Sequence, residues 1–427
     1  MTERSRQPVP FRPGQRLSCV WVLAGLSCAP VAPVQAPQST EGATPSSTPR
    51  TPPPSQAKPA TEPSDGERYE WESETLSPRP GEDQAELKQL WSQCKRTDRA
   101  LHRVAQRMAA RRARGQPKFE LPQIVFALRA EGSPYVWARG WTVEGLALDP
   151  ADTRQRMKRW LDSFEATGSL RCGVGNARAR DGTEIVSAVA VDVLADMKPL
   201  PTRARLGQWL KLETELAVRP REAQLVLLGP RGLPDIRSGT IQGKTISQSF
   251  SLDHPGTWLI QVVATVPGGP RPVAEAMVHV DAEPPSAFHS QPAPGEKAGR
   301  TGSSDQSKIE RMANAARASE GVGRLRRDRR LDAVAQAHAD AMRDARRIGH
   351  DVGQGDPRAR IEAAGLPIRS AGENVAHADD LGRAHRALWS SPSHRGTMLH
   401  AQFNSIGVGV AHDPDGSVWV CQVFAEF

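Results

Sequence analysis

Apolar positions recur at helical spacing in the last third of the chain. From Leu331 onward they follow one another at steps of three and four residues, which predicts a helix that ends near Gly349. His338 falls on the apolar face of this helix, so its side chain is expected to point into the core. Shorter helices are predicted over 309–318 and 381–389.

Two later segments alternate with a period of two instead. Residues 404–412 and 417–424 are rich in β-branched and aromatic side chains, which is typical of strands. Asp413-Pro-Asp-Gly416, between them, has the residues of a tight turn. The pattern predicts a β-hairpin.

A central region, 197–282, contains only short alternating runs, several of them separated by Gly-Pro turns. Evenly spaced strands of this length predict a β-sandwich. His254-Pro-Gly-Thr-Trp258-Leu resembles Ig-like modules of bacterial surface proteins, which serve as spacers or binding faces. The predicted strands are 210–218, 223–228, 245–252, 258–266 and 274–280.

The side chains that can titrate near neutral pH or bind a metal gather after residue 305. Seven of the eleven histidines lie there, so any chemistry of the chain is expected in this part. These histidines are His338, His350, His377, His385, His394, His400 and His412.

Short motifs follow one another in the same part of the chain. They are Gly349-His350, Gly372-Glu373-Asn374-Val375-Ala376, Trp389, Ser391-Pro-Ser-His394-Arg395 and Ile406-Gly-Val-Gly409, preceded by Asn314, Arg317, Leu325 and Asp328. In this order and at these spacings, residues 305–427 resemble the CAP superfamily: cysteine-rich secretory proteins, antigen 5, pathogenesis-related class 1 proteins and bacterial secreted members. The resemblance implies an α-β-α sandwich over 307–427.

The family places two histidines and two glutamates around a central cleft, where several members hold a divalent metal. His350 and His394 match the histidines and Glu373 matches the first glutamate, while Ser390-Ser391-Pro392 stands in place of the second. Two imidazoles and one carboxylate form a three-ligand set with open positions, suited to zinc or another divalent metal. The cleft residues implied by the resemblance are His350, Glu373, Asn374, Ser391 and His394.

These residues also have plainer interpretations. Glu373 is as compatible with a structural hydrogen bond as with a metal or substrate contact, and Asn374 is expected to be a structural hydrogen-bonding residue. No Gly-x-Ser-x-Gly motif surrounds Ser391, which disfavours a serine hydrolase. The histidines without a motif partner are expected to face solvent; they are His377, His385, His400 and His412.

The N-terminal segment 1–28 has the pattern of a signal peptide. Two arginines precede an apolar run that is too short to span a bilayer and has the length of a signal-peptide core. Ala24-Gly-Leu-Ser-Cys28 resembles a bacterial lipobox, which implies lipidation of Cys28 and membrane attachment through its acyl chains. Ordinary cleavage after Ala36 is the alternative. Both predict export, as a membrane-anchored lipoprotein or as a secreted or periplasmic protein.

Cysteine usage and charge add little more. No disulfide framework is implied, although Cys94 and Cys172 can pair in an oxidising compartment; Cys421, in a predicted strand, is expected to be a small buried apolar residue. The formal charge of +8 comes from arginines spread along the chain, without the aromatic and basic pattern of nucleic-acid binding. A lipid or an anionic envelope component is the expected partner.

Residues 84–196 are predicted to be a degenerate CAP-like copy of the C-terminal domain, with chance likeness as the alternative. The segment 127–134 aligns without a gap with 360–367, and 172–182 resembles 406–416. The alignment puts Gly140 and Trp141 opposite Glu373 and Asn374, and no histidine opposite His394. The predicted fold class is multidomain α+β, comprising a signal peptide 1–28, a Pro/Ser-rich linker 29–83, the copy 84–196, the Ig-like β-sandwich 197–282, a linker 283–306 and the CAP domain 307–427.

Three functions are compatible with this pattern. We favour an exported, non-catalytic cell-envelope protein whose C-terminal cleft binds a small apolar ligand, a divalent metal or a wall component. The second is a zinc-assisted hydrolase, in which His350, His394 and Glu373 hold zinc or Glu373 is the base for a bound water. The third is a structural surface-display protein. The missing second glutamate disfavours the enzyme, and three retained polar residues, costly in a core, disfavour the structural protein.

Overall fold

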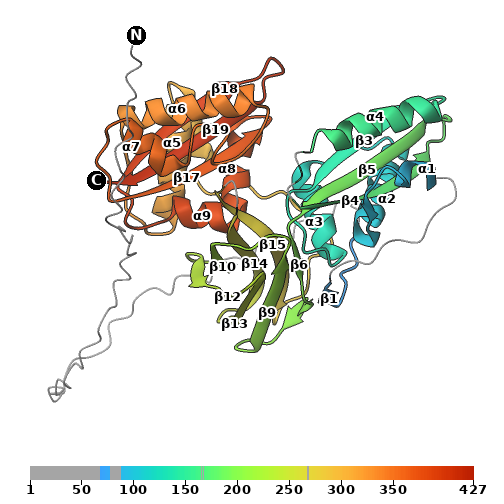
Figure 1. The fold of residues 1–427 in the computed structure, drawn as a ribbon, viewed down its shortest axis with the longest axis horizontal. Coiled ribbons are helices and arrows are strands. Elements are labelled where there is room, and N and C mark those ends of the chain that lie inside the picture. Colours follow the sequence, from blue (N-terminus) through green and yellow to red (C-terminus); the bar gives the residue numbers. More distant parts are fainter. Residues whose placement is uncertain (1–67, 77–87, 165, 167, 267–268) are drawn as a thin grey trace, which may run out of the picture. The chain divides into compact units, whose positions relative to one another are not determined.

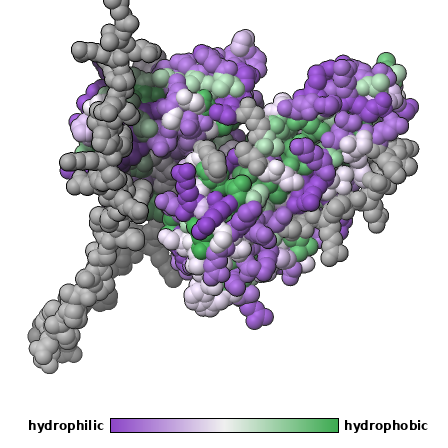
Figure 2. All heavy atoms as spheres, in the orientation of Figure 1, coloured by the Kyte–Doolittle hydropathy of each residue, from purple (hydrophilic) through white to green (hydrophobic). Residues whose placement is uncertain are grey.

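The computed structural model describes residues 68–76, 88–164, 166, 168–266 and 269–427. The predicted signal peptide, its Cys28 and nearly all of the predicted linker 29–83 lie outside these residues. Among the described residues, no helix is long and apolar enough to cross a membrane. Hydrophilic side chains cover most of the face shown in Figure 2.

The C-terminal region is built on a four-stranded sheet (Figure 1). β18 and β19 form the predicted hairpin, β17 pairs antiparallel with β19, and β16 runs parallel to β18. β17 is therefore the last strand of the sheet, and no strand of the described residues pairs with its outer edge. In spatial order the strands are β16 (Arg326–Arg327), β18 (Ser405–His412), β19 (Val418–Glu426) and β17 (Ser370–Ala378).

Helices cover both faces of this sheet, because alternate residues of β19 are apolar on both sides. Trp419, Cys421 and Val423 pack with α6 and α7, whereas Val420 and Phe424 pack with α5, α8 and α9. The helices are η2 (Glu296–Thr301), α5 (Asp305–Ser319), α6 (Arg329–Asp344), α7 (Pro357–Ala363), α8 (Leu381–Ser390) and α9 (Pro392–Met398).

The helix α6 ends at Asp344, earlier than the predicted end near Gly349. Arg346 takes a left-handed backbone conformation, with φ of 52°, which stops the helix. His338 is fully buried on this helix, as predicted. The early end of α6 leaves a loop before α7, and this loop carries His350.

Two glycines of β18 let α6 lie directly on the strand. A Cβ at Gly407 would be 2.2 Å from the carbonyl carbon of Leu331, and one at Gly409 would be 2.2 Å from the carbonyl oxygen of Ala335. No side chain fits into those distances, so the Gly-Val-Gly motif is a packing requirement of the fold.

Family-matched residues of α5 also serve the fold. Asn314 donates to the carbonyl oxygen of Leu325 at 3.1 Å and accepts from its N–H at 2.8 Å. The Arg317 guanidinium is buried and donates to the carbonyl oxygens of Gly323 at 2.6 Å and Met398 at 2.8 Å. These side chains pair buried backbone groups of loops that have no strand partner.

The central region consists of two sheets that enclose one apolar core. Leu212 and Phe250 of one sheet and Ile260 and Val278 of the other belong to the same buried cluster. The first sheet is β11 (Asp235–Ser238), β10 (Glu222–Leu228), β14 (Gly256–Val266), β15 (Gly269–Val280) and β8 (Arg203–Ala204). The second is β12 (Thr240–Gln242), β13 (Thr245–Ser251), β9 (Trp209–Leu216) and β6 (Ala195–Met197). β9, β10, β13, β14 and β15 lie where five strands were predicted.

The first region has a four-stranded sheet with the strand order and directions of the C-terminal sheet. Its strands are β2 (Arg96–Thr97), β4 (Ser169–Arg178), β5 (Glu184–Val193) and β3 (Arg139–Gly145), with β2 parallel to β4. Its helices are α1 (Lys88–Trp91), α2 (Arg99–Ala113), α3 (Leu121–Ala130) and α4 (Pro150–Asp162). A short pair, β1 (Glu74–Thr75) with β7 (Leu200–Pro201), lies outside this sheet.

The first region also repeats the close contact between helix and strand. A Cβ at Gly173 of β4 would lie 2.0 Å from the backbone nitrogen of His102 in α2, and one at Gly175 would lie 2.4 Å from the Cα of Gln106. Gln106 bonds both backbone groups of Asn176, as Gln336 of α6 bonds both backbone groups of Val410.

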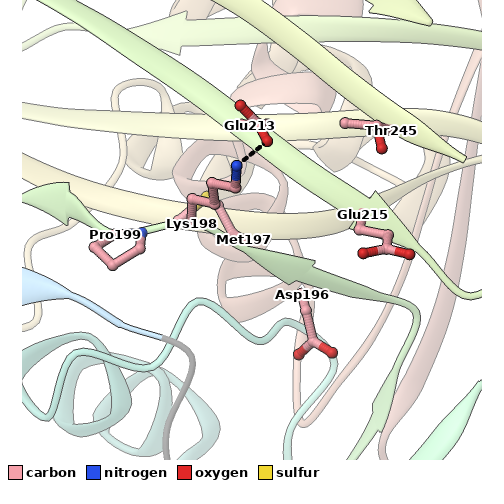
Figure 3. Close-up of a pocket in the computed structure, with 7 residues that line it drawn as sticks. All are labelled: Asp196, Met197, Lys198, Pro199, Glu213, Glu215 and Thr245. Atoms are coloured by element: carbon pink, nitrogen blue, oxygen red, sulfur yellow. Dashed lines mark ion pairs between the residues drawn. The ribbon is translucent and has the colours of Figure 1, made fainter. Parts of the chain in front are cut away.

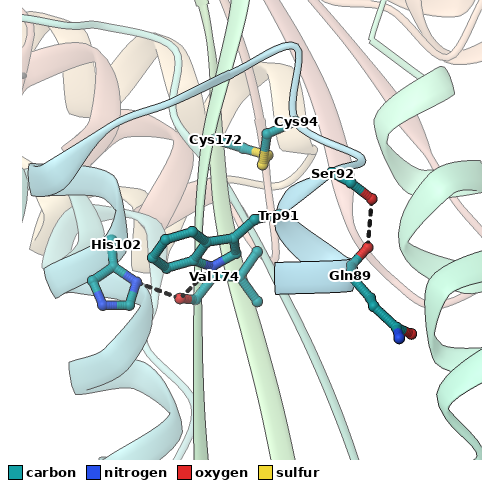
Figure 4. Close-up of a disulfide and its surroundings, with 7 residues drawn as sticks. All are labelled: Gln89, Trp91, Ser92, Cys94, His102, Cys172 and Val174. Atoms are coloured by element: carbon teal, nitrogen blue, oxygen red, sulfur yellow. Dashed lines mark hydrogen bonds between the residues drawn. A yellow bond between two sulfur atoms is a disulfide. The ribbon is translucent and has the colours of Figure 1, made fainter. Parts of the chain in front are cut away.

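A disulfide joins Cys94 and Cys172, as the sequence allowed (Figure 4). It ties the loop after α1 to β4, with the two Cα atoms 5.5 Å apart. The Trp91 indole donates to the carbonyl oxygen of Val174, at 3.4 Å, beside the bridge. Cys421 is a free, buried cysteine, also as predicted.

Candidate functional site

Glu373 lies at the centre of the C-terminal site. It stands on β17, and strand alternation turns it toward the face covered by α6 and α7. Its side chain has no solvent exposure, and the Nδ1 atom of His350 lies 2.9 Å from its Oε1. Burial raises the pKa of Glu373, but the facing His350, Arg360 and His338 outweigh burial and lower it, so the carboxyl group is ionised at neutral pH.

Arg360 of α7 forms an ion pair with the other oxygen of Glu373. It is buried, and its Nη1 also donates to the carbonyl oxygen of His350 at 2.7 Å and to that of Gly355. A buried carboxylate needs this compensation, because desolvation otherwise favours its protonated form. Sequence reasoning missed Arg360, because α7 is too short to show a periodic pattern.

Two more residues complete the surroundings of Glu373. The Cys421 thiol donates to Glu373 Oε2 at 3.3 Å, and burial raises the pKa of this thiol well above its usual value. His338 Nε2 lies 2.9 Å from the carbonyl oxygen of Gly349 and 3.7 Å from Glu373 Oε1. Desolvation by burial lowers the pKa of His338, so its ring is neutral.

Asn374, the next residue of β17, turns to the opposite face of the sheet. It is fully buried, and its side-chain nitrogen donates to the carbonyl oxygen of His394 at 2.9 Å. Asn374 is therefore the structural hydrogen-bonding residue that the sequence suggested, and it holds the backbone of α9. Its side-chain oxygen has no partner.

His394 approaches the edge of β17 from α9, whereas His350 approaches it from the loop after α6. Burial, and then the charge of His350, lower the pKa of His394 to about 3. A neutral imidazole next to His350 is thus expected over the whole physiological range. The charge of His350 acts on His394, so the two rings belong to the same part of the domain.

The remaining predicted residues lie outside this group. Ser391 Oγ lies 3.4 Å from Ser393 Oγ and hydrogen-bonds none of the other predicted residues. His377, His400 and His412 are exposed, as expected. His385 was predicted to face solvent, and this was wrong: it is fully buried, with Nε2 2.8 Å from the carbonyl oxygen of Pro294. It lies on the inner face of α8, which the sequence spacing alone did not orient.

The three predicted metal-binding residues are not arranged as a ligand set. Among the described residues, no group of three or more His, Cys, Asp or Glu side chains could hold a metal ion. Glu373 contacts Arg360 with one oxygen and His350 with the other, so it would have to give up a contact to become a ligand. The donors left at this edge are the rings of His350 and His394, and the metal site stays a prediction.

A separate hollow of about 280 Å³ lies on the sandwich region (Figure 3). It contains the ion pair between Lys198 and Glu213 and none of the residues predicted for the site. Its lining is Asp196, Met197, Lys198, Pro199, Glu213, Glu215 and Thr245. Charged side chains line this hollow beside Met197 and Pro199, and it is not part of the predicted site.

The first region has a glycine where the C-terminal region has Glu373. Gly140 and Glu373 pair with corresponding valines of β5 and β19, and these valines in turn pair with the helix-contacting glycines Gly173 and Gly407. A Cβ at Gly140 would lie 2.6 Å from the side chain of Ile124, so apolar groups fill the space.

The comparisons with known proteins address the C-terminal region. The model of the cysteine-rich secretory protein family, CAP, matches residues 310–423. This part of the chain is a CAP domain. The resemblance inferred from its motifs is thereby confirmed, together with the mixed α/β fold.

One curated relative is an uncharacterized protein, YkwD, of Bacillus subtilis (strain 168). It is 30% identical over 143 residues, which are 32% of this chain. The chain spans about half, 55%, of the length of this relative.

Solved structures with similar parts also come from bacteria. An extracellular protein containing an SCP domain from Bacillus anthracis is 21% identical, covering 42% of this chain and 67% of its own, with a TM-score of 0.27. An outer surface protein from Borrelia burgdorferi is 22% identical, covering 28% and 89%, with a TM-score of 0.27. A cysteine-rich secretory protein from Staphylococcus aureus is 11% identical, covering 64% and 90%, with a TM-score of 0.26.

Proposed function

We propose that this protein is an exported, non-catalytic envelope protein whose CAP domain binds a ligand at the edge of β17. The observation that carries the proposal is the placement of His350, which is 21% exposed while its ring is held by the buried Glu373. The imidazole of His350 lies at the surface, and the buried Glu373–Arg360 ion pair holds it in place. Together with the neutral His394, it forms a preorganised site that can accept a hydrogen bond from a ligand or bind a metal. Its ligand is a divalent metal, a wall component or a small apolar molecule with a hydrogen-bonding group.

The same geometry disfavours the hydrolase with Glu373 as base. Both oxygens of Glu373 are engaged, by Arg360 and Cys421 on one side and His350 on the other. A general base must lie within hydrogen-bond reach of the proton that it abstracts, and the side chain of Glu373 has no solvent exposure. The zinc-assisted hydrolase is kept as the alternative function, and the ligand experiments described below also test it.

Export is supported by the Cys94–Cys172 disulfide, because stable disulfides form in oxidising compartments. Lipidation of Cys28 is the proposed means of membrane attachment. Replacing Cys28 by Ala is then expected to move the protein from the membrane fraction to the soluble fraction and to abolish labelling by a radioactive fatty acid. Membrane fractionation and labelling that persist in the variant would contradict lipidation at Cys28, and a wild type that is neither labelled nor membrane-bound would leave ordinary secretion as the route.

We further propose that the first region is a degenerate CAP-like domain and that the central region is an Ig-like spacer. The identical strand order, the helix-contacting glycines and the paired Gln106 and Gln336 support the copy. With Gly140 in place of Glu373, the copy has no equivalent site, so ligand binding is expected in the C-terminal domain alone.

Zinc titration of the full chain tests the site first. The comparison is with a His350→Ala/His394→Ala variant and with a matched control, His377→Ala/His412→Ala, which removes two exposed histidines of the same domain. Zinc that binds with one-to-one stoichiometry to the wild type and the control, but not to the first variant, supports a metal ligand.

Without zinc binding, the same three proteins are titrated with a fluorescent fatty acid and with solubilised wall fragments. Loss of binding in the first variant alone supports the proposal for that ligand. Equal binding by all three proteins, or no binding of any probe, contradicts a ligand site at this edge. Hydrolysis of an added ester or peptide substrate that depends on zinc and Glu373 would favour the enzyme.

A further inference from the structure

Arg360 contacts both partners of the His350–Glu373 pair. Its Nη2 pairs with Glu373 Oε2, and its Nη1 donates to the main-chain carbonyl oxygen of His350 at 2.7 Å. The guanidinium thus fixes the carboxylate and, at the same time, the backbone that carries the imidazole. A planar group with donors in a rigid fork suits this double role better than a lysine would.

The contact between His350 and Glu373 determines where the imidazole carries its proton. Glu373 is ionised and can only accept, so the facing Nδ1 of a neutral His350 must be the protonated nitrogen. Nε2 then has the free lone pair. None of the hydrogen bonds among the described residues uses this nitrogen, and the side chain reaches the surface.

We propose that Arg360 is a positioning residue, which acts through Glu373 to hold His350 in the tautomer that presents the Nε2 lone pair to a ligand. Glu373 is then a partner of the imidazole rather than a direct ligand, and the site accepts a hydrogen bond or coordinates a metal through the histidine. The inference rests on the proposed ligand site at the edge of β17. It assigns a role to a residue that the motifs did not point to.

The first region supports the view that Glu373, Arg360 and His338 occur together as one group. Met108 stands as far after its N-cap aspartate in α2 as His338 does in α6, and Ala127 stands as far before a left-handed glycine as Arg360 does. Together with Gly140, the positions that match Glu373, Arg360 and His338 are therefore all apolar there. A buried ion pair is costly unless all its partners are present, so the group is expected to occur whole or not at all.

Nitrogen NMR of the full chain, labelled with ¹⁵N in histidine, tests the inference directly. Two-bond correlations between ring protons and nitrogens distinguish the tautomers, and the signals of His350 are identified by their absence from a His350→Gln variant. In the wild type, the neutral ring of His350 is expected to have its proton on Nδ1 and none on Nε2. Arg360→Gln is expected to lose this pattern and to show a mixture of tautomers, while Arg360→Lys retains part of it.

Arg358→Gln is the matched control, because Arg358 lies on the same helix in an exposed ion pair with Glu362. It should leave the His350 signals unchanged. A proton on Nε2 in the wild type overturns the inference even if no variant folds. An unchanged tautomer in a folded Arg360→Gln protein overturns the role of Arg360.

The two proposals fail in different ways. No binding of any ligand combined with the expected tautomer would overturn the proposed function alone. Ligand binding through His350 combined with the opposite tautomer would overturn this inference alone.

Discussion

At the scale of single residues, the stability of the CAP domain depends on charged side chains that are buried. Glu373 and Arg360 are both buried, and they form an ion pair with each other. Breaking such a pair leaves an unpaired charge in a medium of low dielectric constant, whereas removing both charges costs much less.

Glu373→Gln is expected to lower the free energy of unfolding of the CAP domain by about 3 kcal/mol, because the Arg360 charge stays buried without a counter-ion. The double variant Glu373→Gln/Arg360→Met should be destabilised by less than the sum of the single changes. Urea denaturation of the four proteins measures this cycle. The exposed Arg358–Glu362 pair is the control, expected to contribute less than about 1 kcal/mol; equal effects at both sites would contradict a buried pair.

His394 makes the domain sensitive to acid. Its pKa falls from 6.5 to about 3 on folding, mainly through desolvation by burial, so below pH 6.5 the unfolded chain binds a proton that the folded chain does not bind. Stability therefore falls as the pH drops from 6.5 toward 3, by at most about 1.4 kcal/mol per pH unit. His394→Gln should flatten this dependence when unfolding is compared at about pH 5 and about pH 7.5. His377→Gln, which changes an exposed side chain, should leave this dependence of stability on pH as it is in the wild type. Equal slopes in all three proteins would refute the lowered pKa of His394.

At the scale of elements, contacts between helices and strands explain which motifs are structural. Asn314, Arg317 and the glycines of β18 hold loops and helices in place and contact no part of the site. The sequence predicted α5, α6, α8 and the hairpin of β18 and β19, because their apolar periods are long enough to detect. It missed the early end of α6 and the role of α7, because a left-handed residue and a helix of seven residues leave no periodic signal.

Gly407→Ala is expected to destabilise the CAP domain by about 3 kcal/mol or more, because the added methyl group would overlap the backbone of α6. Gly323→Ala is the matched control, since a Cβ there meets no atom within 4 Å. Thermal unfolding of both variants gives the comparison. Equal melting temperatures would mean that α6 does not lie on β18 as described.

At the scale of the whole molecule, the disulfide is a difference between the first region and the CAP domain, whose sheets have the same strand order. It closes a loop between residues 78 positions apart in the first region, and the CAP domain has a free cysteine instead. Cross-linking residues this far apart restricts the unfolded chain considerably.

Cys94→Ala/Cys172→Ala is expected to lower the free energy of unfolding of the first region by about 3–4 kcal/mol. The unfolding of the CAP domain, followed by calorimetry in the same protein, should not change. Cys421→Ala provides the contrast, because it removes a cysteine from the CAP domain and leaves the bridge intact. A double variant that unfolds like the wild type would show that the bridge does not form in the protein.

The sequence by itself determined five strands of the central region, the helices α5, α6 and α8, the β18–β19 hairpin and the family of the last domain, because apolar periods and ordered motifs are local properties that survive without coordinates. It also identified His350, Glu373 and His394. Only the tertiary structure decided what surrounds them, because an ion pair between α7 and β17 depends on how distant segments pack. Arg360 of α7 engages the carboxylate that the sequence had assigned to a metal.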